Sequence, residues 1–338
     1  MTVLIISIIG IILMSGCVAN TPIDETVNIS YVCDPVGMEN NNDEFVASAI
    51  SEIEDYYGDY FDFKSHIYKV KDLDDAKAVS KKAAADGADL YIGTSYAVNN
   101  ELLHAIDDKS KAVLAMIGSD IPTEKNNVVS VTFRDEESAF LAGYLAAAES
   151  KTGVIGYIGG YDSDDTEIFA GFYYGAKYKD PTVVVYDAYT NSYTNSVKGR
   201  NAAEELKGKN ADVIFVNCGS CALGISELVR GSEVRLILSS QYEISSDEVI
   251  ASCRQYVKNA AMFVVDEYLN EQLEAASYRH GISYGFVDLK IEDSISREIK
   301  DEVALVRSDI RTSKIKVPTE VDGNILSSKD AAKVPEGQ

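Results

Sequence analysis

The sequence predicts an α/β protein of two lobes, in which two doubly wound parallel sheets are joined by a hinge as in a clamshell. Short apolar strand patterns alternate with amphipathic helix patterns along most of the chain. This alternation is typical of repeated βα units whose parallel sheet is covered on both faces. The pattern restarts near residue 135, and 338 residues exceed one typical domain, so a second lobe is expected.

The first lobe begins with the strand pattern TVNISYV, which is followed by the amphipathic helix pattern EFVASAISEIEDYY. The same rhythm then repeats with short apolar strands such as DLYIG and AVLAMI. The predicted strands are 26–32, 66–70, 89–93, 112–117 and 128–133, and the predicted helices are 44–57, 74–86 and 97–107.

The second lobe begins with the long Ala-rich helix pattern DEESAFLAGYLAAAES and the strand pattern GVIGYIG. Segment 249–269 is expected to cross back to the first sheet. The predicted strands are 153–159, 182–189, 211–218, 234–240 and 284–291, and the predicted helices are 135–150, 166–178, 197–207, 221–230 and 296–311. The expected organisation is a signal peptide (1–16), a lipid-anchored tether (17–26), lobe 1 (27–133 plus 254–281), lobe 2 (134–253 plus 282–318) and a polar tail (319–338).

Two facing sheets of this type predict one cleft between the lobes. Ligands bind beyond the carboxyl ends of the strands in doubly wound sheets. Hinge closure around a small molecule is therefore the expected motion.

The net charge of −23 excludes two classes of partner. A chain this acidic repels nucleic acids and anionic lipid headgroups, so neither is an expected partner. The content of 46% hydrophobic and 25% charged residues is that of an ordinary soluble globular protein.

The N-terminus has the features of a lipoprotein signal. Residues 2–14 are apolar and lead into Ser15, Gly16 and Cys17, a run that suits a signal-peptide core better than a membrane span. Small residues before a cysteine suit a lipoprotein signal peptidase, so Cys17 is the expected lipidation site. The region before the apolar run lacks Lys and Arg, and Met14 is unusual at its position, so a plain N-terminal membrane anchor is the alternative. Either reading places the body outside the cell.

Four further cysteines would then face an oxidising compartment. Cys218 and Cys221 form a C-G-S-C motif with redox spacing, whereas Cys33 and Cys253 stand alone. A thioredoxin-type motif opens a helix after the first strand of a βαβ unit, and this one lies deep in the chain. Buried thiols or a structural disulfide are therefore favoured over a catalytic pair.

The sequence predicts neither an enzyme nor a cofactor or metal site. Its three histidines are scattered, and the motifs H-E-x-x-H, G-x-S-x-G and G-x-x-x-x-G-K-[ST] do not occur. The run 162–165, DSDD, lacks the later ligands of a calcium loop, and Asp164 with Glu167 fits a helix capping box better. The glycines of 153–160 do not have dinucleotide-binding spacing.

Several motifs occur in order along the chain, beginning with VTFRDEESAFLAGYLAA, and together they resemble those of the basic membrane lipoproteins, the substrate-binding components of ABC transporters. The strongest match is VTFRDEESAFLAGYLAA (131–147), and the resemblance spans about residues 27–318. Further matches are GVIGYIGG, FAGFYYGAKYKDP, KGRNAAEELKGKNADVIFVNCG, YGFVDL and SKIKVP. The resemblance implies a type I periplasmic-binding fold and a nucleoside ligand. It also implies ABC permease and ATPase partners, and a monomer is expected.

The resemblance also implies a site in which two aromatic rings enclose the base. Segment 34–48 keeps Asp34, Asp43 and Phe45 of the family motif, so Phe45 is expected on one face of the base and Asp34 at its edge. Tyr193 matches the second aromatic. Each stacking contact is worth about 1–3 kcal/mol. The ligand-binding residues expected from the resemblance are Asp34, Asp43, Phe45, Tyr193, Gly219, Ser240, Gln241 and Gln255.

The ribose end departs from the family pattern. The acid that clamps the hydroxyl groups falls on Leu238, and the family lysine falls on Gln255. Losing such an acid would cost about 2–4 kcal/mol for a nucleoside. The implied ligand is therefore a nucleoside or another flat heterocycle, including a nucleobase or a modified nucleoside.

The function implied is that of an extracytoplasmic solute-binding lipoprotein of an ABC importer, which binds and closes without bond chemistry. One alternative is a ligand-sensing receptor subunit built on the same fold. A more distant one is a disulfide oxidoreductase that uses Cys218 and Cys221.

Overall fold

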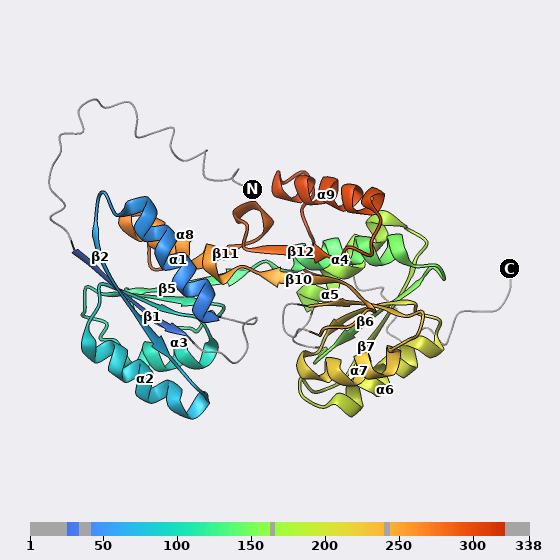
Figure 1. Cartoon of the computed structure of the whole chain (residues 1–338), viewed down its shortest axis with the longest axis horizontal. Coiled ribbons are helices and arrows are strands. Elements are labelled where there is room, and N and C mark those ends of the chain that lie inside the picture. The colour runs from blue at the N-terminus through green and yellow to red at the C-terminus, as the bar shows by residue number, and fades with distance from the viewer. Residues whose placement is uncertain (1–25, 34–41, 163–165, 240–243, 322–338) are drawn as a thin grey trace.

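A computed structural model describes residues 26–33, 42–162, 166–239 and 244–321. The described chain forms two lobes, each built around one six-stranded sheet (Figure 1). The two sheets have equivalent strand orders, β2-β1-β3-β4-β5-β11 and β7-β6-β8-β9-β10-β12. The predicted fold class, two α/β lobes with doubly wound sheets, is confirmed.

The first sheet is parallel throughout its described pairs. Helices α1 and α8 cover one face, and α2 and α3 cover the other (Figure 1). The strands are β1 (Thr26–Cys33), β2 (Asp62–Lys69), β3 (Leu90–Gly93), β4 (Val113–Ile117), β5 (Val128–Phe133) and β11 (Ser277–His280), and the helices are α1 (Asn42–Tyr57), α2 (Leu73–Asp86), α3 (Tyr96–Ala105) and α8 (Val257–Leu269).

The second sheet is covered by α4, α5 and α9 on one face and by α6 and α7 on the other (Figure 1). Its strands are β6 (Val154–Gly159), β7 (Val184–Tyr189), β8 (Val213–Asn217), β9 (Arg235–Leu238), β10 (Val249–Gln255) and β12 (Val287–Ile291). Its helices are α4 (Asp135–Glu149), α5 (Thr166–Lys179), α6 (Ser196–Gly208), α7 (Ala222–Val229) and α9 (Arg297–Arg311), with short 3-10 turns at Gly219–Cys221 and Ile282–Tyr284.

Three details of the prediction need correction. Strand β12 runs antiparallel to β10, so the second sheet is mixed rather than parallel. Segment 249–269 does not simply cross back, because its first part is strand β10 of the second sheet and only α8 belongs to the first lobe. The sequence SYRH of β11, which adds an edge strand to the first sheet, was not predicted as a strand.

Local sequence explains the start of several helices. Helix α9 buries Val303, Val306 and Ile310, which share one face at helical spacing. Its first turn is capped by Ser296, and Asp72 and Ser95 cap α2 and α3 in the same way. The predicted capping residue Asp164 lies outside the described residues, as do the residues from 322 onward.

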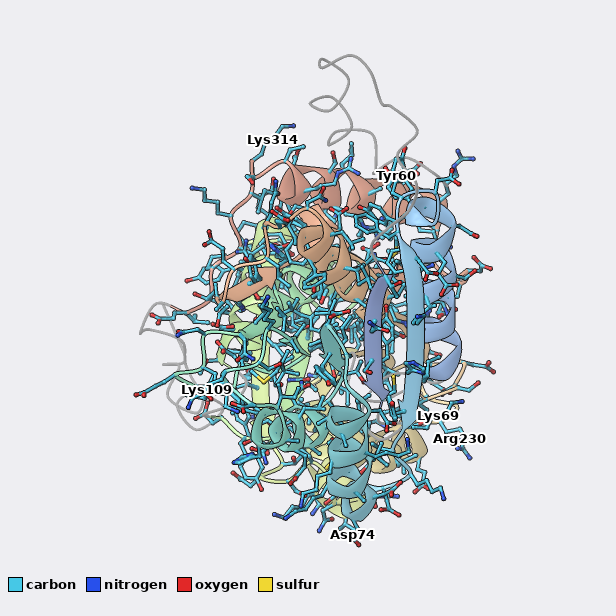
Figure 2. All side chains as sticks on the ribbon, turned by 90° about the vertical axis from the view of Figure 1, so that its left-hand side faces the viewer. Tyr60, Lys69, Asp74, Lys109, Arg230 and Lys314 are labelled. Atoms are coloured by element: carbon cyan, nitrogen blue, oxygen red, sulfur yellow. The ribbon has the colours of Figure 1, made fainter. Side chains whose placement is uncertain are left out.

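Most charged side chains lie on the outside of the lobes, as Lys69 and Asp74 do on the first (Figure 2). The strands and the inner faces of the helices form apolar cores. Among the described helices, none has both the length and the apolar run that crossing a membrane requires.

Helices α4 and α5 touch backbone to backbone. A Cβ atom at Gly143 would lie 1.9 Å from the carbonyl oxygen of Phe172, and one at Gly175 would lie 1.9 Å from that of Phe140. Any side chain at these positions would force the helices apart. Glycine is therefore required where LAGYLAA and FAGFYYGAKY face each other, and the two helices form one rigid unit.

We expect Gly175→Ala to lower the free energy of unfolding by about 1–3 kcal/mol, because the added methyl group overpacks a backbone contact. Gly208→Ala is the matched control, since nothing lies within 4 Å of a Cβ atom there. That variant should be neutral or more stable by up to about 1 kcal/mol. Urea denaturation of both variants measures the difference, and equal effects would contradict the contact.

Candidate functional site

The described chain passes between the lobes three times, and each passage starts at the carboxyl end of a strand. The first crossing follows β5 at Arg134, the second follows β10 at Tyr256, and the third joins β11 to β12 through 281–286. The carboxyl ends of strands in both sheets therefore meet at the junction (Figure 1). This is the edge at which doubly wound sheets bind ligands.

Backbone hydrogen bonds tie the crossings together. The Arg134 N–H donates to the His280 carbonyl at 2.9 Å, and the Tyr256 N–H donates to the Phe286 carbonyl at 2.8 Å. The first bond joins the first crossing to the end of β11, where the third crossing begins, and the second bond joins the second crossing to the third. The three segments consequently form one compact hinge.

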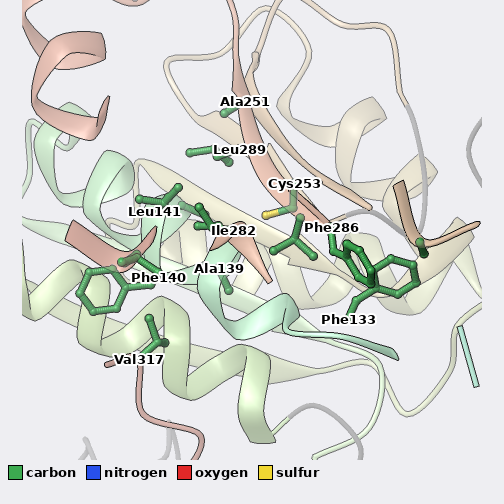
Figure 3. Close-up of a cluster of buried hydrophobic side chains, with 14 of the residues drawn as sticks. Phe133, Ala139, Phe140, Leu141, Ala251, Cys253, Ile282, Phe286, Leu289 and Val317 are labelled. Carbon is green, nitrogen blue, oxygen red and sulfur yellow. The ribbon is translucent and has the colours of Figure 1, made fainter. Parts of the chain in front are cut away.

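An apolar core continues beneath the hinge (Figure 3). The ring of Phe133, the last residue of β5, lies 5.9 Å from the ring of Phe286 in the third crossing. Cys253 of β10 and Ala139 of α4 are buried in the same cluster. The hinge therefore has a packed apolar base.

Buried carboxylates at the start of α4 hold Arg134 of the first crossing and Arg279 of β11. The side chain of Glu136 has 0% exposure and accepts hydrogen bonds from Arg134 Nε at 3.1 Å and Arg279 Nη2 at 2.7 Å. Glu137 Oε1 pairs with Arg134 Nη1 at 3.0 Å, and its Oε2 accepts from the Ile282 N–H at 2.8 Å. Buried carboxylates need such partners, so these two acids are structural.

Arg279 also links the two lobes directly. It lies on β11 of the first sheet, and its Nη2 contacts Glu167 Oε2 on α5 as well as Glu136. One guanidinium group thus holds two acids of the second lobe at the junction.

Asp135, the first residue of α4, has a different partner. The side-chain amide of Gln255 at the end of β10 donates to both of its oxygens, at 3.0 and 2.8 Å. Burial raises the pKa of Asp135 to about 6, the Gln255 bond and Arg279 oppose this shift, and the negative charges of Glu136 and Glu167 add to it. The sequence analysis predicted a role for Gln255 but not for Asp135, although three consecutive acids stand one residue after a predicted strand.

Tyr193 follows β7 and lies against the carboxyl end of β6. A Cβ atom at Gly160 would be 2.0 Å from Tyr193 Cε1, so only glycine lets the ring lie there. The Tyr161 ring meets that of Tyr193 edge to face, with centroids 5.4 Å apart. The glycine pair 159–160 therefore makes room for an aromatic ring.

Gly219 lies directly against the backbone of Tyr193. Its φ is +56°, and a Cβ atom there would be 2.7 Å from the Tyr193 carbonyl oxygen. The same oxygen accepts a hydrogen bond from the Ser220 hydroxyl at 3.2 Å. The structure thus brings Tyr193 and Gly219 together, whereas Gln255 lies with Asp135 at the hinge.

The C-G-S-C turn supports the Tyr193 loop. Cys218 and Cys221 are buried thiols, and no disulfide joins any of the four cysteines within the described part of the chain. The Cys221 thiol donates to the Ser192 carbonyl at 3.2 Å. Of the two readings favoured from sequence, the structure has buried thiols rather than a disulfide.

The remaining expected residues cannot be placed as side chains. Asp34, Ser240, Gln241 and Cys17 lie outside the described residues. Asp43 and Phe45 belong to α1, but their side chains lie outside the described part of the structure. Leu238 is buried at the end of β9.

Ionisation of Asp135 should lower stability, because its folded pKa of about 6 exceeds the ordinary value of 3.8. The folded state then binds more protons than the unfolded state between these values, and its stability falls as pH rises. We expect the free energy of unfolding of the native chain, relative to Asp135→Asn, to fall by about 1–3 kcal/mol from pH 4 to pH 7. Parallel pH profiles of the two proteins in urea denaturation would contradict this.

Comparison with known proteins agrees with this architecture. The family model for PnrA-like ABC transporter substrate-binding proteins, Bmp, matches residues 37–320. Basic membrane protein B of Borrelia garinii subsp. bavariensis is 28% identical over 284 residues, which are 79% of this chain and 81% of that protein. The ABC transporter nucleoside-binding protein BmpA of Lactococcus lactis subsp. cremoris is 28% identical over 263 residues, 70% of this chain and 73% of its own.

Solved structures share the fold at low sequence identity. An ABC transporter solute-binding protein from Conexibacter woesei has a TM-score of 0.67 at 16% sequence identity. The match covers 87% of this chain and 99% of the Conexibacter chain. A transcriptional activator of the comK gene from Bacillus halodurans has a TM-score of 0.68 at 16% identity, covering 86% and 99%. The resemblance seen in the sequence is confirmed, and because the family model spans most of its length, this chain belongs to the Bmp family of PnrA-like ABC transporter substrate-binding proteins.

Proposed function

We propose that this solute-binding protein closes its lobes on a nucleoside or a similar flat heterocycle and delivers it to an ABC permease and its ATPase. The observation that supports this most directly is Tyr193, whose ring lies on Gly160 at the carboxyl end of β6, the edge where such sheets bind ligands. The printed name of a relative, a nucleoside-binding protein of Lactococcus lactis, points to the same ligand class.

The proposed site encloses the base between Tyr193 of the second lobe and Phe45 of the first. Aromatic side chains suit this task because every heterocyclic base has a π-face, and stacking contributes about 1–3 kcal/mol per base. Asp34 would accept hydrogen bonds from the edge of the base. Backbone groups at Gly219 and polar groups at Asp43, Ser240, Gln241 and Gln255 complete the proposed set.

The chain is proposed to work as a monomer on the outer face of the cell membrane, held by a lipid on Cys17. The apolar run 2–14 directly before Ser15, Gly16 and Cys17 supports this. Its family is one of extracytoplasmic, membrane-associated binding proteins.

Lipid anchoring predicts that Cys17→Ala abolishes labelling by a radioactive or clickable fatty acid during expression. Cys33→Ala is the control, since Cys33 is buried within β1 and should leave labelling intact. Labelling of the Cys17→Ala chain would contradict the anchor and favour an uncleaved membrane segment.

Ligand binding is tested by a thermal-shift screen of the body from about residue 22 against nucleosides, nucleobases and other heterocycles. A ligand at 100 times its Kd should stabilise the fold by about 2.7 kcal/mol. If no nucleoside or base raises Tm, the ligand assignment is wrong.

The site is tested with Tyr193→Ala and Phe45→Ala. Each should weaken binding of the best ligand by about 5- to 150-fold, the equivalent of one lost stacking contact. Tyr60→Ala removes a ring that is 66% exposed at the turn after α1 and should bind as the native protein does. Unchanged affinity in both site variants would show that the ligand does not bind between these two rings.

A further inference from the structure

Resting on the proposed function, we propose that Asp135 is a specificity-determining acid of the interlobe site. Its carboxylate accepts a hydrogen bond from a donor group of an uncharged ligand and disfavours anionic ligands, phosphorylated nucleosides above all. Gln255 acts as the positioning residue that holds this carboxylate.

The position of Asp135 supports this role. Asp135 begins α4 immediately after the first crossing, and Gln255 ends β10 immediately before the second. Because the Gln255 amide reaches both carboxylate oxygens, at 3.0 and 2.8 Å, the carboxylate lies between these two crossings. The carboxyl ends of β5 and β10 meet there, at the edge expected to face the ligand.

Asp135 also differs from the two acids that follow it. Glu136 and Glu137 are buried and bound by Arg134, and Arg279 binds Glu136 too. Asp135 is largely buried but keeps more exposure than Glu136 and Glu137, and no lysine or arginine nitrogen of the described chain lies within 4.0 Å of it. A carboxylate has about four acceptor positions, and the amide of Gln255 occupies at most two of them. Capacity for a ligand donor therefore remains.

The charges around Asp135 explain the discrimination. Its charged neighbours are Glu136 and Glu167, and the guanidinium of Arg279 is already engaged by those same two acids. Gln255 contributes no charge. An anionic group entering here would meet uncompensated negative charge at low dielectric, whereas a hydroxyl or amino group would meet an acceptor.

The experiment is isothermal titration of the native protein and Asp135→Asn with adenosine, guanosine, inosine and their 5′-monophosphates. The native protein should prefer each nucleoside that it binds over its monophosphate by at least 10-fold. Asp135→Asn should weaken nucleoside binding by at least 10-fold and reduce that preference by a similar factor. A change in preference separates specificity from a loss of folding, since a merely structural role would weaken both ligands alike.

Two further variants sharpen the test. Gln255→Lys places an ammonium group against Asp135 and should also reduce the preference for the nucleoside, while the carboxylate is retained. Glu233→Gln removes one negative charge from a side chain that is 93% exposed and should leave the preference unchanged. Circular dichroism confirms that each variant is folded.

The outcomes separate the two proposals. An unchanged preference in both Asp135→Asn and Gln255→Lys, or a native protein that binds monophosphates as tightly as nucleosides, overturns the role of Asp135 alone. If the native protein binds none of the six probes, the assignment to purine nucleosides fails, and the proposal for Asp135 toward them fails with it.

Discussion

The junction between the lobes depends on the ion pairs that the buried carboxylate of Glu136 forms with two arginines. This carboxylate has no exposure and is bound by Arg134 of the first crossing and Arg279 of β11. An unpartnered carboxylate at this depth would be strongly destabilising, so both guanidinium groups must remain where α4 begins. This requirement fixes the start of α4 against the edge of the first sheet. It also keeps the carboxyl ends of strands from both sheets facing one another.

Helices α4 and α5 of the second lobe are closely coupled, because no side chain lies between them at their closest points. Gly143 and Gly175 allow backbone contact between α4 and α5, and a Cβ atom at Gly171 would lie 2.2 Å from the Glu136 carbonyl oxygen. A rotation of α4 must therefore carry α5 with it. Hinge closure of the kind proposed for this protein would therefore need its backbone changes in the crossings rather than between α4 and α5.

Most of the fold could be predicted because buried parallel strands are short apolar runs, as VLAMI of β4 and VIFVN of β8 show. Strand β11 was missed because SYRH lies at a half-exposed edge and has no apolar pattern. Strand β10 was missed because its apolar residues continue almost directly into α8. Strand β12 is antiparallel because of the point at which the chain re-enters the second sheet. That point is set by tertiary structure and cannot be predicted from a local sequence pattern.

The candidate site also contains residues that the sequence could indicate and residues that only the structure reveals. Tyr193 and Gly219 could be selected from the sequence through motif resemblance, but the reason for Gly160, the ring of Tyr193 lying on it, appears only in three dimensions. Asp135 could not be distinguished from Glu136 and Glu137, since three adjacent acids look alike in a sequence. The three acids differ in the side chain that binds each of them, and Asp135 is bound by the amide of Gln255, 120 residues further along the chain. The proposed specificity therefore depends on a contact between the end of β10 and the start of α4, so a substitution at Gln255 would change the surroundings of an acid that the substitution leaves in place.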